Sequence, residues 1–359
     1  MYIERVSLKN FRNYEKRTVE FKDGLNIVIG KNASGKTNLI ESLYCAGIGK
    51  SPRTNKYKEM IKWGSDFAYI KIVLKKNKTT HTIEYSIDNQ DKKRIAIDSI
   101  PLVKLSEILG MLNIVFFSPD EMKLVKESPV ERRRFMDISL SQQNKNYFNA
   151  LSKYNNIISQ RNRLLKEQKD AKILKEMLYG WDKQLAEYGA IIISKRYEFI
   201  EKIKVFAQKM HCEISENKEN LSLEYECDIE NSDKETLSQK FFEKLYENFE
   251  KDMSLQYTSF GCHRDDIAIK INDIDARKFA SQGQQRTVAL SLKLAEIYFF
   301  ESETGEKPVL LLDDVLSELD MGRRQKLIEL STGLQTMITC TDFDGKNIDY
   351  NQINIGENS

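Results

Sequence analysis

The chain has 359 residues, of which 31% are charged and 40% hydrophobic, and its formal net charge is +2. This length suggests two or three structural units, and the near-neutral charge favours neither the presence nor the absence of a nucleic-acid partner. Five scattered cysteines argue against a disulfide framework or a zinc site, and without a signal-peptide layout or a long apolar run we expect a cytoplasmic protein outside the membrane.

Residues 1–125 have a mostly strand-like pattern. Short apolar runs at 19–21 and 25–29 flank a turn signal, and 38–46 has the spacing of a helix. Runs at 68–74 and 80–87 alternate apolar with polar residues, which predicts an antiparallel pair with one exposed side. A compact apolar strand is expected at 113–117.

The character changes after residue 125 and returns after 252. Residues 126–252 are predicted to form an inserted lobe, helical at 132–165, 173–213 and 234–251 with a strand-like run at 221–229. No heptad pattern is long enough for an extended coiled coil. In 253–359, strands at 267–271, 309–312 and 335–340 and helices at 286–300 and 323–330 indicate a parallel sheet covered by helices.

A glycine-bracketed loop follows the strand at 25–29 and precedes the helix at 38–46. Its residues are Gly30, Lys31, Asn32, Ala33, Ser34, Gly35, Lys36 and Thr37. This is the spacing of a phosphate-binding loop, in which backbone amides surround phosphate oxygens at a helix N-terminus. We expect Lys36 to bridge the β- and γ-phosphates of ATP and Thr37 to ligate Mg²⁺. The alternative, a chance match in a glycine turn, is weakened by the correct flanks.

Two carboxylates end the apolar run at 309–312. Asp313 is expected to bind Mg²⁺, and Asp314 to orient and deprotonate the attacking water. Asp314 is one methylene shorter than the glutamate usual at this position in ABC transporters, so it depends on backbone adjustment to reach that water. We therefore expect slow turnover, suited to a switch. Alone, an apolar run followed by acids is common.

A second polar loop with a glycine stands at the start of the helix at 286–300. Ser281, Gly283 and Gln284 look like the signature loop of ABC-type ATPases, which completes the ATP site of a second copy of the chain. The pairing of the two loops thus predicts an ATP-dependent homodimer. The alternative is an ordinary helix cap after a polar turn. Similarly, residues 316–320 are either the loop that crosses the dimer interface in ABC-type ATPases or a turn that caps the next helix through Asp320.

Basic residues are dense between 123 and 175, with thirteen Lys or Arg against five Asp or Glu. The cluster Arg132, Arg133 and Arg134 is the densest part, and aromatic residues are interspersed. Such a stretch suits a DNA backbone, although a solvated helical face is equally compatible with it.

Several segments together resemble the RecF family of bacterial DNA-repair ATPases, which is related to ABC and SMC heads. They lie at 8–14, 30–41, 117–126, 128–129, 131–137, 261–266, 281–287 and 313–320. The resemblance implies an α/β, ABC-ATPase-like head, with a mixed sheet and a P-loop, plus an inserted helical lobe and no long coiled coil. It also implies an ATP-closed clamp on single- and double-stranded DNA that acts with RecR and RecO to help load RecA at gaps.

The resemblance also assigns further residues. Arg12 and Asn38 match positions near the nucleotide, and Thr341 or Asp342 falls where a γ-phosphate switch residue is expected. Cys262 and Lys31 depart from the family pattern without removing a phosphate or metal ligand. Two other functions fit a nucleotide-binding chain. One is the nucleotide-binding subunit of a transporter, which the large helical insertion disfavours. The other is a scaffold that binds nucleotide without hydrolysing it.

Overall fold

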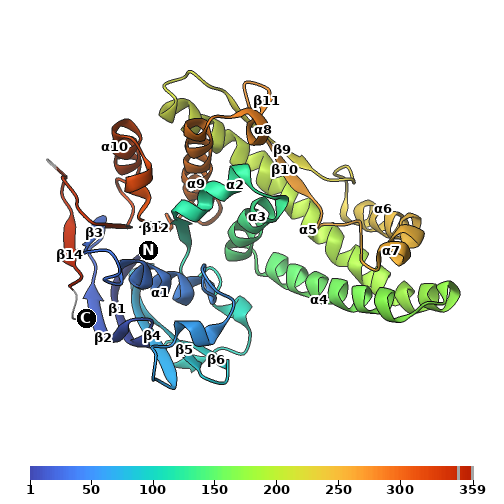
Figure 1. Cartoon of the computed structure of the whole chain (residues 1–359), viewed down its shortest axis with the longest axis horizontal. Coiled ribbons are helices and arrows are strands. Elements are labelled where there is room, and N and C mark those ends of the chain that lie inside the picture. Colours follow the sequence, from blue (N-terminus) through green and yellow to red (C-terminus); the bar gives the residue numbers. More distant parts are fainter. Residues whose placement is uncertain (346–347, 357–359) are drawn as a thin grey trace. The chain divides into compact units, whose positions relative to one another are not determined.

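The computed structural model describes residues 1–345 and 348–356, with the side chains of 121 and 122 excepted. The chain divides into two compact units (Figure 1). Unit 1 comprises residues 1–122 and 289–359, and unit 2 comprises residues 123–288. Unit 2 is therefore an insertion within the sequence of unit 1.

Unit 1 contains a six-stranded antiparallel sheet of order β2-β1-β4-β5-β6-β7. Its strands are β1 (Tyr2–Phe11), β2 (Tyr14–Glu20), β4 (Phe67–Lys76), β5 (Thr79–Asp88), β6 (Lys93–Ile97) and β7 (Ile100–Pro101). In β4, the buried residues Ala68, Ile70, Ile72 and Leu74 alternate with outward-facing ones. This period of two gives the sheet one apolar face and one polar face.

The second sheet of unit 1 is parallel, with the order β14-β3-β13-β12-β8. Its strands are β3 (Leu25–Ile29), β8 (Ile114–Phe117), β12 (Val309–Asp313), β13 (Thr336–Cys340) and β14 (Asn351–Asn354). Every residue of β12 and β13 is buried, as expected for parallel strands covered on both faces. Helix α1 (Lys36–Ile48) contacts strands of both sheets.

The remaining elements of unit 1 are short. They are α10 (Met321–Leu330) and the 3-10 helices η1 (Tyr57–Met60), η2 (Leu105–Glu107), η3 (Pro119–Met122) and η4 (Val315–Glu318). Asp320 caps α10, because its carboxylate accepts a hydrogen bond from the amide of Arg323 at 2.9 Å.

Unit 2 is predominantly helical. Its elements are α2 (Lys123–Lys126), α3 (Pro129–Gln143), α4 (Lys145–Glu167), α5 (Ala171–Ile214), α6 (Lys234–Glu247), α7 (Phe249–Leu255), α8 (Ala276–Phe279) and the sheet β11-β10-β9. The strands of that sheet are β9 (Leu221–Glu226), β10 (Asp266–Ile271) and β11 (Ile274–Asp275). Helix α9 (Gln282–Thr304) begins in unit 2, and the unit boundary falls at 288/289 within it.

Several expected boundaries differ from the structure. The helix predicted at 132–165 is two helices, α3 and α4, which are separated at Asn144, and the helix predicted at 234–251 is α6 and α7, which are separated at Asn248. The run at 19–21 is not a separate strand, because β2 extends back to Tyr14 and pairs with β1. The predicted boundary at 252/253 differs from the unit boundary at 288/289 because β10 pairs with β9, which ties residues after 252 to the inserted helices.

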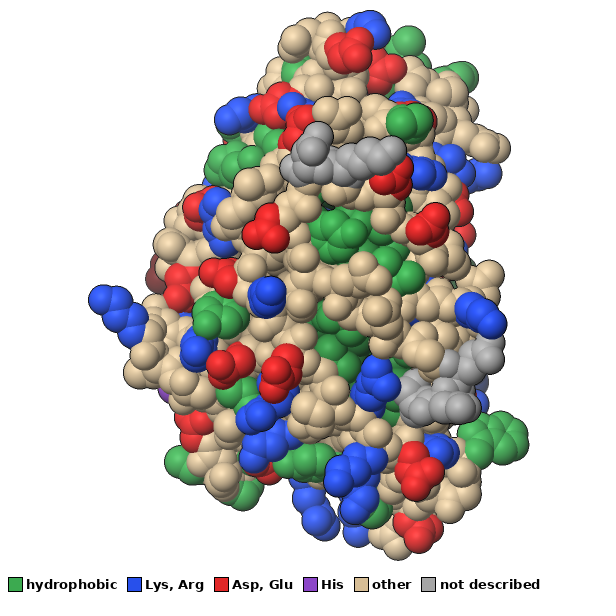
Figure 2. All heavy atoms as spheres, turned by 90° about the vertical axis from the view of Figure 1, so that its left-hand side faces the viewer, with side chains coloured by type: hydrophobic (Ala, Val, Ile, Leu, Met, Phe, Trp, Pro, Cys, Tyr) green, Lys and Arg blue, Asp and Glu red, His purple; other side chains and the backbone are tan. Residues whose placement is uncertain are grey.

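No helix of the described residues is long and apolar enough to cross a bilayer. Acidic and basic side chains are intermingled on the face shown in Figure 2, although Lys and Arg gather toward its lower end. On this face the mixture of charges agrees with the near-neutral total charge of the chain.

Candidate active site

The glycine loop lies between β3 and α1 and is held by two side chains from the β1–β2 turn. The hydroxyl of Tyr14 donates to the carbonyl of Gly35 at 3.0 Å, and the amide of Asn13 donates to the carbonyl of Ser34 at 3.2 Å. Gly35 has a φ of 108°, and a Cβ there would stand 2.7 Å from the Asn13 side chain. The loop therefore needs glycine at this position both for its conformation and for its close packing.

Lys36 crosses the loop from the first turn of α1. Its ammonium donates to the carbonyls of Gly30 and Lys31 at 2.7 and 2.9 Å, and the residue is 8% exposed. The hydroxyl of Ser34 is buried without a partner among the described residues. An unpartnered buried hydroxyl beside a lysine and a helix N-terminus fits a phosphate group, which supplies the oxygen atoms that such groups bind.

Thr37, Asp313 and Thr339 meet at the carboxyl end of β12. The hydroxyl of Thr37 donates to Asp313 Oδ1 at 3.0 Å, and that of Thr339 donates to the same oxygen at 2.8 Å. Burial raises the pKa of the Asp313 carboxyl, while the two hydroxyls act in the opposite direction. A hydroxyl and a carboxylate side by side form the oxygen donor set that Mg²⁺ prefers, so these residues fit that ion.

Asp314 follows with a left-handed backbone, at a φ of 54°. Its amide donates to the hydroxyl of Thr339 at 2.9 Å, which holds this conformation, and its side chain is exposed. Positive φ in a non-glycine residue costs about 1–3 kcal/mol and is concentrated at functional sites. Asp314 is thus exposed directly beside the buried Asp313, and the two carboxylates have different surroundings.

Arg12 is held by two groups of unit 1 rather than projecting freely. Its guanidinium binds both carboxylate oxygens of Glu41 at 2.9 and 2.6 Å and also donates to the carbonyl of Glu59. Arg53 shares Glu41, at 3.1 Å, and donates to Asn38 Oδ1 at 3.0 Å. The positive charge of Arg53 is a minor effect that opposes the rise in the pKa of Asp313 caused by burial, and it favours the ionised form of that carboxyl.

The loop expected to act on a second copy forms the N-terminal cap of α9. The amide of Gln284 donates to the hydroxyl of Ser281 at 3.2 Å, and the amide of Ser281 donates to Gln284 Oε1 at 2.8 Å. This reciprocal pair is a capping box. Ser281 is exposed, and Gly283 is half-buried. Thr341 and Asp342, at the end of β13, are exposed as well.

The structure corrects the expectation that Arg132 faces DNA. Arg132 is 2% exposed and binds both oxygens of Asp266 at 2.6 and 2.8 Å. Arg133 is half-buried and donates to the carbonyl of Asp265 at 2.6 Å. Arg134 is exposed, with Glu131 at 3.7 Å. The helical period explains the difference, because three consecutive residues cannot share one face of α3.

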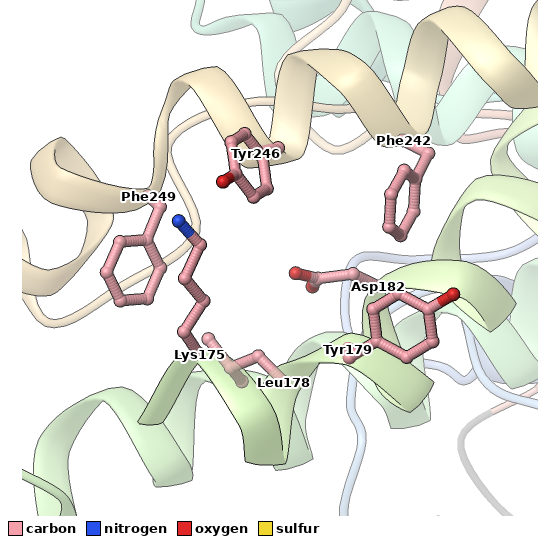
Figure 3. Close-up of a pocket in the computed structure, with 7 residues that line it drawn as sticks. All are labelled: Lys175, Leu178, Tyr179, Asp182, Phe242, Tyr246 and Phe249. Atoms are coloured by element: carbon pink, nitrogen blue, oxygen red, sulfur yellow. The ribbon is translucent and has the colours of Figure 1, made fainter. Parts of the chain in front are cut away.

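A small hollow between α5 and the α6–α7 segment offers no second nucleotide site. Its volume is about 40 Å³, room for very few water molecules. Figure 3 shows the ammonium of Lys175 beside the rings of Tyr246 and Phe249, whose centroids lie 3.9 and 5.5 Å away. The hollow is thus occupied in part by the chain's own cation. Its lining residues are Lys175, Leu178, Tyr179, Asp182, Phe242, Tyr246 and Phe249.

Sequence reasoning missed the roles of Thr339 and Arg53. Both lie outside the recognisable motifs, and neither has a local spacing that indicates a function. The sequence prediction for this stretch named Thr341 or Asp342 as the switch residue, and did not single out Thr339, which bonds the carboxylate of Asp313 and the backbone amide of Asp314. The available signal was weak: two threonines, Thr336 and Thr339, lie in a short apolar run, and most buried hydroxyls have a hydrogen-bond partner, but the sequence does not show which of the two has one.

Comparison with known proteins places these features in a family. Residues 2–344 match the family described as the RecF/RecN/SMC N terminal domain. The chain is 44% identical over 341 residues to the DNA replication and repair protein RecF of Clostridium novyi, covering 95% of this chain and 93% of that protein. It is 46% identical over 344 residues to the RecF of Alkaliphilus oremlandii, with the same coverage.

Solved structures agree with this assignment. The structure of the recombination mediator protein RecF-ATPrS in the RecFOR pathway superposes with a TM-score of 0.91 at 37% identity, covering 98% of this chain and 96% of that one. An SMC head bound to the C-winged helix domain of ScpA gives a TM-score of 0.54 at 18% identity, a likeness that concerns the fold alone.

Proposed function

Because the chain belongs to the RecF family of ABC- and SMC-like heads, we propose that it is an ATP-dependent DNA clamp of DNA replication and recombinational repair. The observation that carries this proposal is the convergence of Lys36 and Thr37 of α1, Asp313 of β12 and Thr339 of β13, three separate segments, on one edge of the parallel sheet. Unit 1 is the nucleotide-binding lobe, unit 2 is the inserted lobe, and the protein acts in the cytoplasm.

In this proposal ATP binds along residues 30–38. Lys36 exchanges the loop carbonyls for phosphate oxygens, and Ser34 gains the partner that it lacks within the described chain. Thr37 and Asp313 hold Mg²⁺, which neutralises charge on the phosphates. Asp314 accepts a proton from the water that attacks the γ-phosphate, and Arg53 stabilises negative charge nearby. Turnover is slow because the short side chain of Asp314 depends on a strained backbone for its position.

We propose that two copies of the chain form a dimer when ATP is bound. The cap of α9 presents Ser281 and the backbone amides at its N-terminus, a geometry that binds anions. In the dimer this cap, with Gly283 and Gln284, contacts the γ-phosphate held by the other copy. Sedimentation with and without ATP measures the closure. We expect Ser281→Arg to remain monomeric with ATP, and a Ser281→Arg protein that still dimerises would contradict this arrangement.

The clamp is proposed to bind single- and double-stranded DNA. Relatives are described as RecF of the RecFOR pathway, so we infer that RecR and RecO are partners and that RecA is loaded at gaps. Thr341 and Asp342 remain the proposed positions of the γ-phosphate switch. Arg134 is the only residue of the three-arginine cluster that we retain as a DNA contact.

The decisive experiment measures phosphate release and DNA binding together. Wild-type protein should hydrolyse ATP slowly, Lys36→Arg should bind neither ATP nor DNA tightly, and Asp314→Asn should bind DNA with ATP and not release it. A scaffold that does not hydrolyse ATP, or another ABC-type ATPase subunit, is the second candidate. Equal phosphate release from the wild type and both variants would favour the scaffold.

A further inference from the structure

The register of the antiparallel sheet in unit 1 aligns an unusual row of side chains on its outer face. Lys9 lies opposite Lys16 on one side and Tyr69 on the other, Tyr69 lies opposite Ser86, and Ser86 lies opposite Arg94. The row therefore crosses β2, β1, β4, β5 and β6 and contains three cations and no acid. We call it the basic row.

The neighbouring outward row is balanced in charge. There Lys71 binds Glu84 at 2.9 Å, across β4 and β5. By contrast, Lys9, Lys16 and Arg94 are all exposed, and none of them has an acidic partner among the residues that the structure describes. Uncompensated charge on this face is therefore concentrated in the basic row.

A fully exposed tryptophan lies at the same end of the sheet. Trp63 is 97% exposed in the turn that precedes β4. The turn is well ordered, because the amide of Lys62 donates to the carbonyl of Asn10 at 2.8 Å and the amide of Ser65 donates to the carbonyl of Lys62 at 3.0 Å. Asn10 directly follows Lys9 in β1, so the turn is anchored beside the basic row. Phe67, 40% exposed, has the ammonium of Lys9 5.3 Å from its ring centroid.

We propose that this outer face binds single-stranded DNA, with Lys9, Lys16 and Arg94 on phosphates and Trp63 stacked on a base. The inference rests on the DNA binding proposed above and assigns it a surface. Four strand spacings separate Lys16 from Arg94, roughly 19 Å, so the basic row is long enough to contact several successive phosphates of one strand. Basic grooves with aromatic platforms are the usual design for single strands. The hydrogen-bonded turn fixes the backbone position of Trp63, and its ring is free to meet a base.

Fluorescence tests the aromatic contact directly. The chain has two tryptophans, so Trp181→Phe leaves Trp63 as the only indole. In this background, oligothymidylate should quench the emission of Trp63 and shield it from acrylamide. Trp63→Ala should lower oligothymidylate affinity by about 5- to 150-fold, the range expected for the loss of one stacked base. Because Trp63 touches solvent almost everywhere, thermal stability should not change.

Salt dependence tests the basic row. Neutralising Lys9, Lys16 and Arg94 to glutamine should reduce the slope of log affinity against log salt by about 2, since each single-strand phosphate contact contributes about 0.7. Lys78→Gln is the matched control, because Lys78 is exposed in the turn at the opposite end of β4 and β5.

The outcomes separate this inference from the proposed function. In one contrary result, the wild type binds oligothymidylate without shielding Trp63, and the variant with Lys9, Lys16 and Arg94 replaced by glutamine has the same salt dependence as Lys78→Gln. That result would refute the proposed binding surface and leave the proposed DNA-clamp function intact. Shielding by duplex DNA only, or by a protein partner only, would also overturn the inference. If the wild type binds no DNA with or without ATP, the proposed function fails as well.

Discussion

Replacing Thr339 by valine removes one hydroxyl from the centre of the site while keeping its shape. Thr339 is fully buried in β13, and its hydroxyl donates to Asp313 and accepts from the amide of Asp314. Valine therefore leaves the carboxylate of Asp313 with one hydrogen-bond donor fewer and removes the acceptor that holds the left-handed backbone of Asp314. We expect ATP hydrolysis to fall more than ATP binding.

The structure sets the size of the effect. A hydrogen bond to a charged group contributes about 1.5–3 kcal/mol. We add nothing for the amide of Asp314, because that residue is exposed and water can replace the lost partner. If the full amount is lost in the transition state, hydrolysis slows by roughly 10- to 150-fold. Losing a hydrogen bond that lowers the pKa of Asp313 should also move the acid limb of the activity profile to higher pH.

The same strand supplies the control. Thr336 is also fully buried, but its hydroxyl has no partner within the described chain. Thr336→Val should therefore leave hydrolysis unchanged and preserve or increase thermal stability. Single-turnover phosphate release across pH, together with thermal unfolding, compares the two variants, and Thr339→Ser should restore much of the activity. Equal hydrolysis rates in Thr339→Val and Thr336→Val would show that Thr339 does not position the carboxylates.

Three further changes have defined outcomes. Arg132→Met should lower the free energy of unfolding by about 3 kcal/mol, because it leaves the carboxylate of Asp266 without its ion-pair partner. The control Arg134→Met should change it by less than about 0.5 kcal/mol. Equal urea midpoints for the two variants would refute the importance of the Arg132–Asp266 ion pair. Asp313→Asn should abolish hydrolysis. It should also raise the stability of the fold at pH 7, because burial raises the folded-state pKa of Asp313 and its ionised form is therefore destabilising. This gain in stability should vanish as the pH falls toward the unfolded-state pKa of about 3.9, and a gain independent of pH would contradict this cause. Gly30→Ala should weaken ATP binding measured by calorimetry, because the added Cβ would meet a backbone carbonyl oxygen at 2.6 Å, and unchanged affinity would show that the loop can adjust.

Local sequence patterns predicted the helices and strands well in the segments where interactions between nearby residues determine the secondary structure. The period of two at 68–74 and 80–87 corresponds to β4 and β5, and the helical composition at 173–213 corresponds to α5. The strand–loop–helix order at 25–46 likewise corresponds to β3 and α1. In these segments propensity, polarity and turn chemistry agree, so little is left for distant contacts to change.

Charged residues were the hardest to interpret, because sequence gives their number but not their partners. Arg132 and Asp266 are 134 residues apart, and only the packing of α3 on β10 brings them together. The pairing turned a predicted DNA contact into a buried ion pair. The exposed cations of the basic row, in contrast, are too far apart in sequence to form a recognisable cluster.

The nucleotide loop, the acidic strand end and the cap of α9 are local features, and the order of residues alone was enough to identify them because each depends on neighbours a few positions away. The composition of the site was decided by the fold. Thr37 and Asp313 are 276 positions apart, and Thr339 joins them because β13 lies beside β12 in the parallel sheet. The path of the chain through two sheets sets these long-range neighbours, and no short-range pattern contains that path.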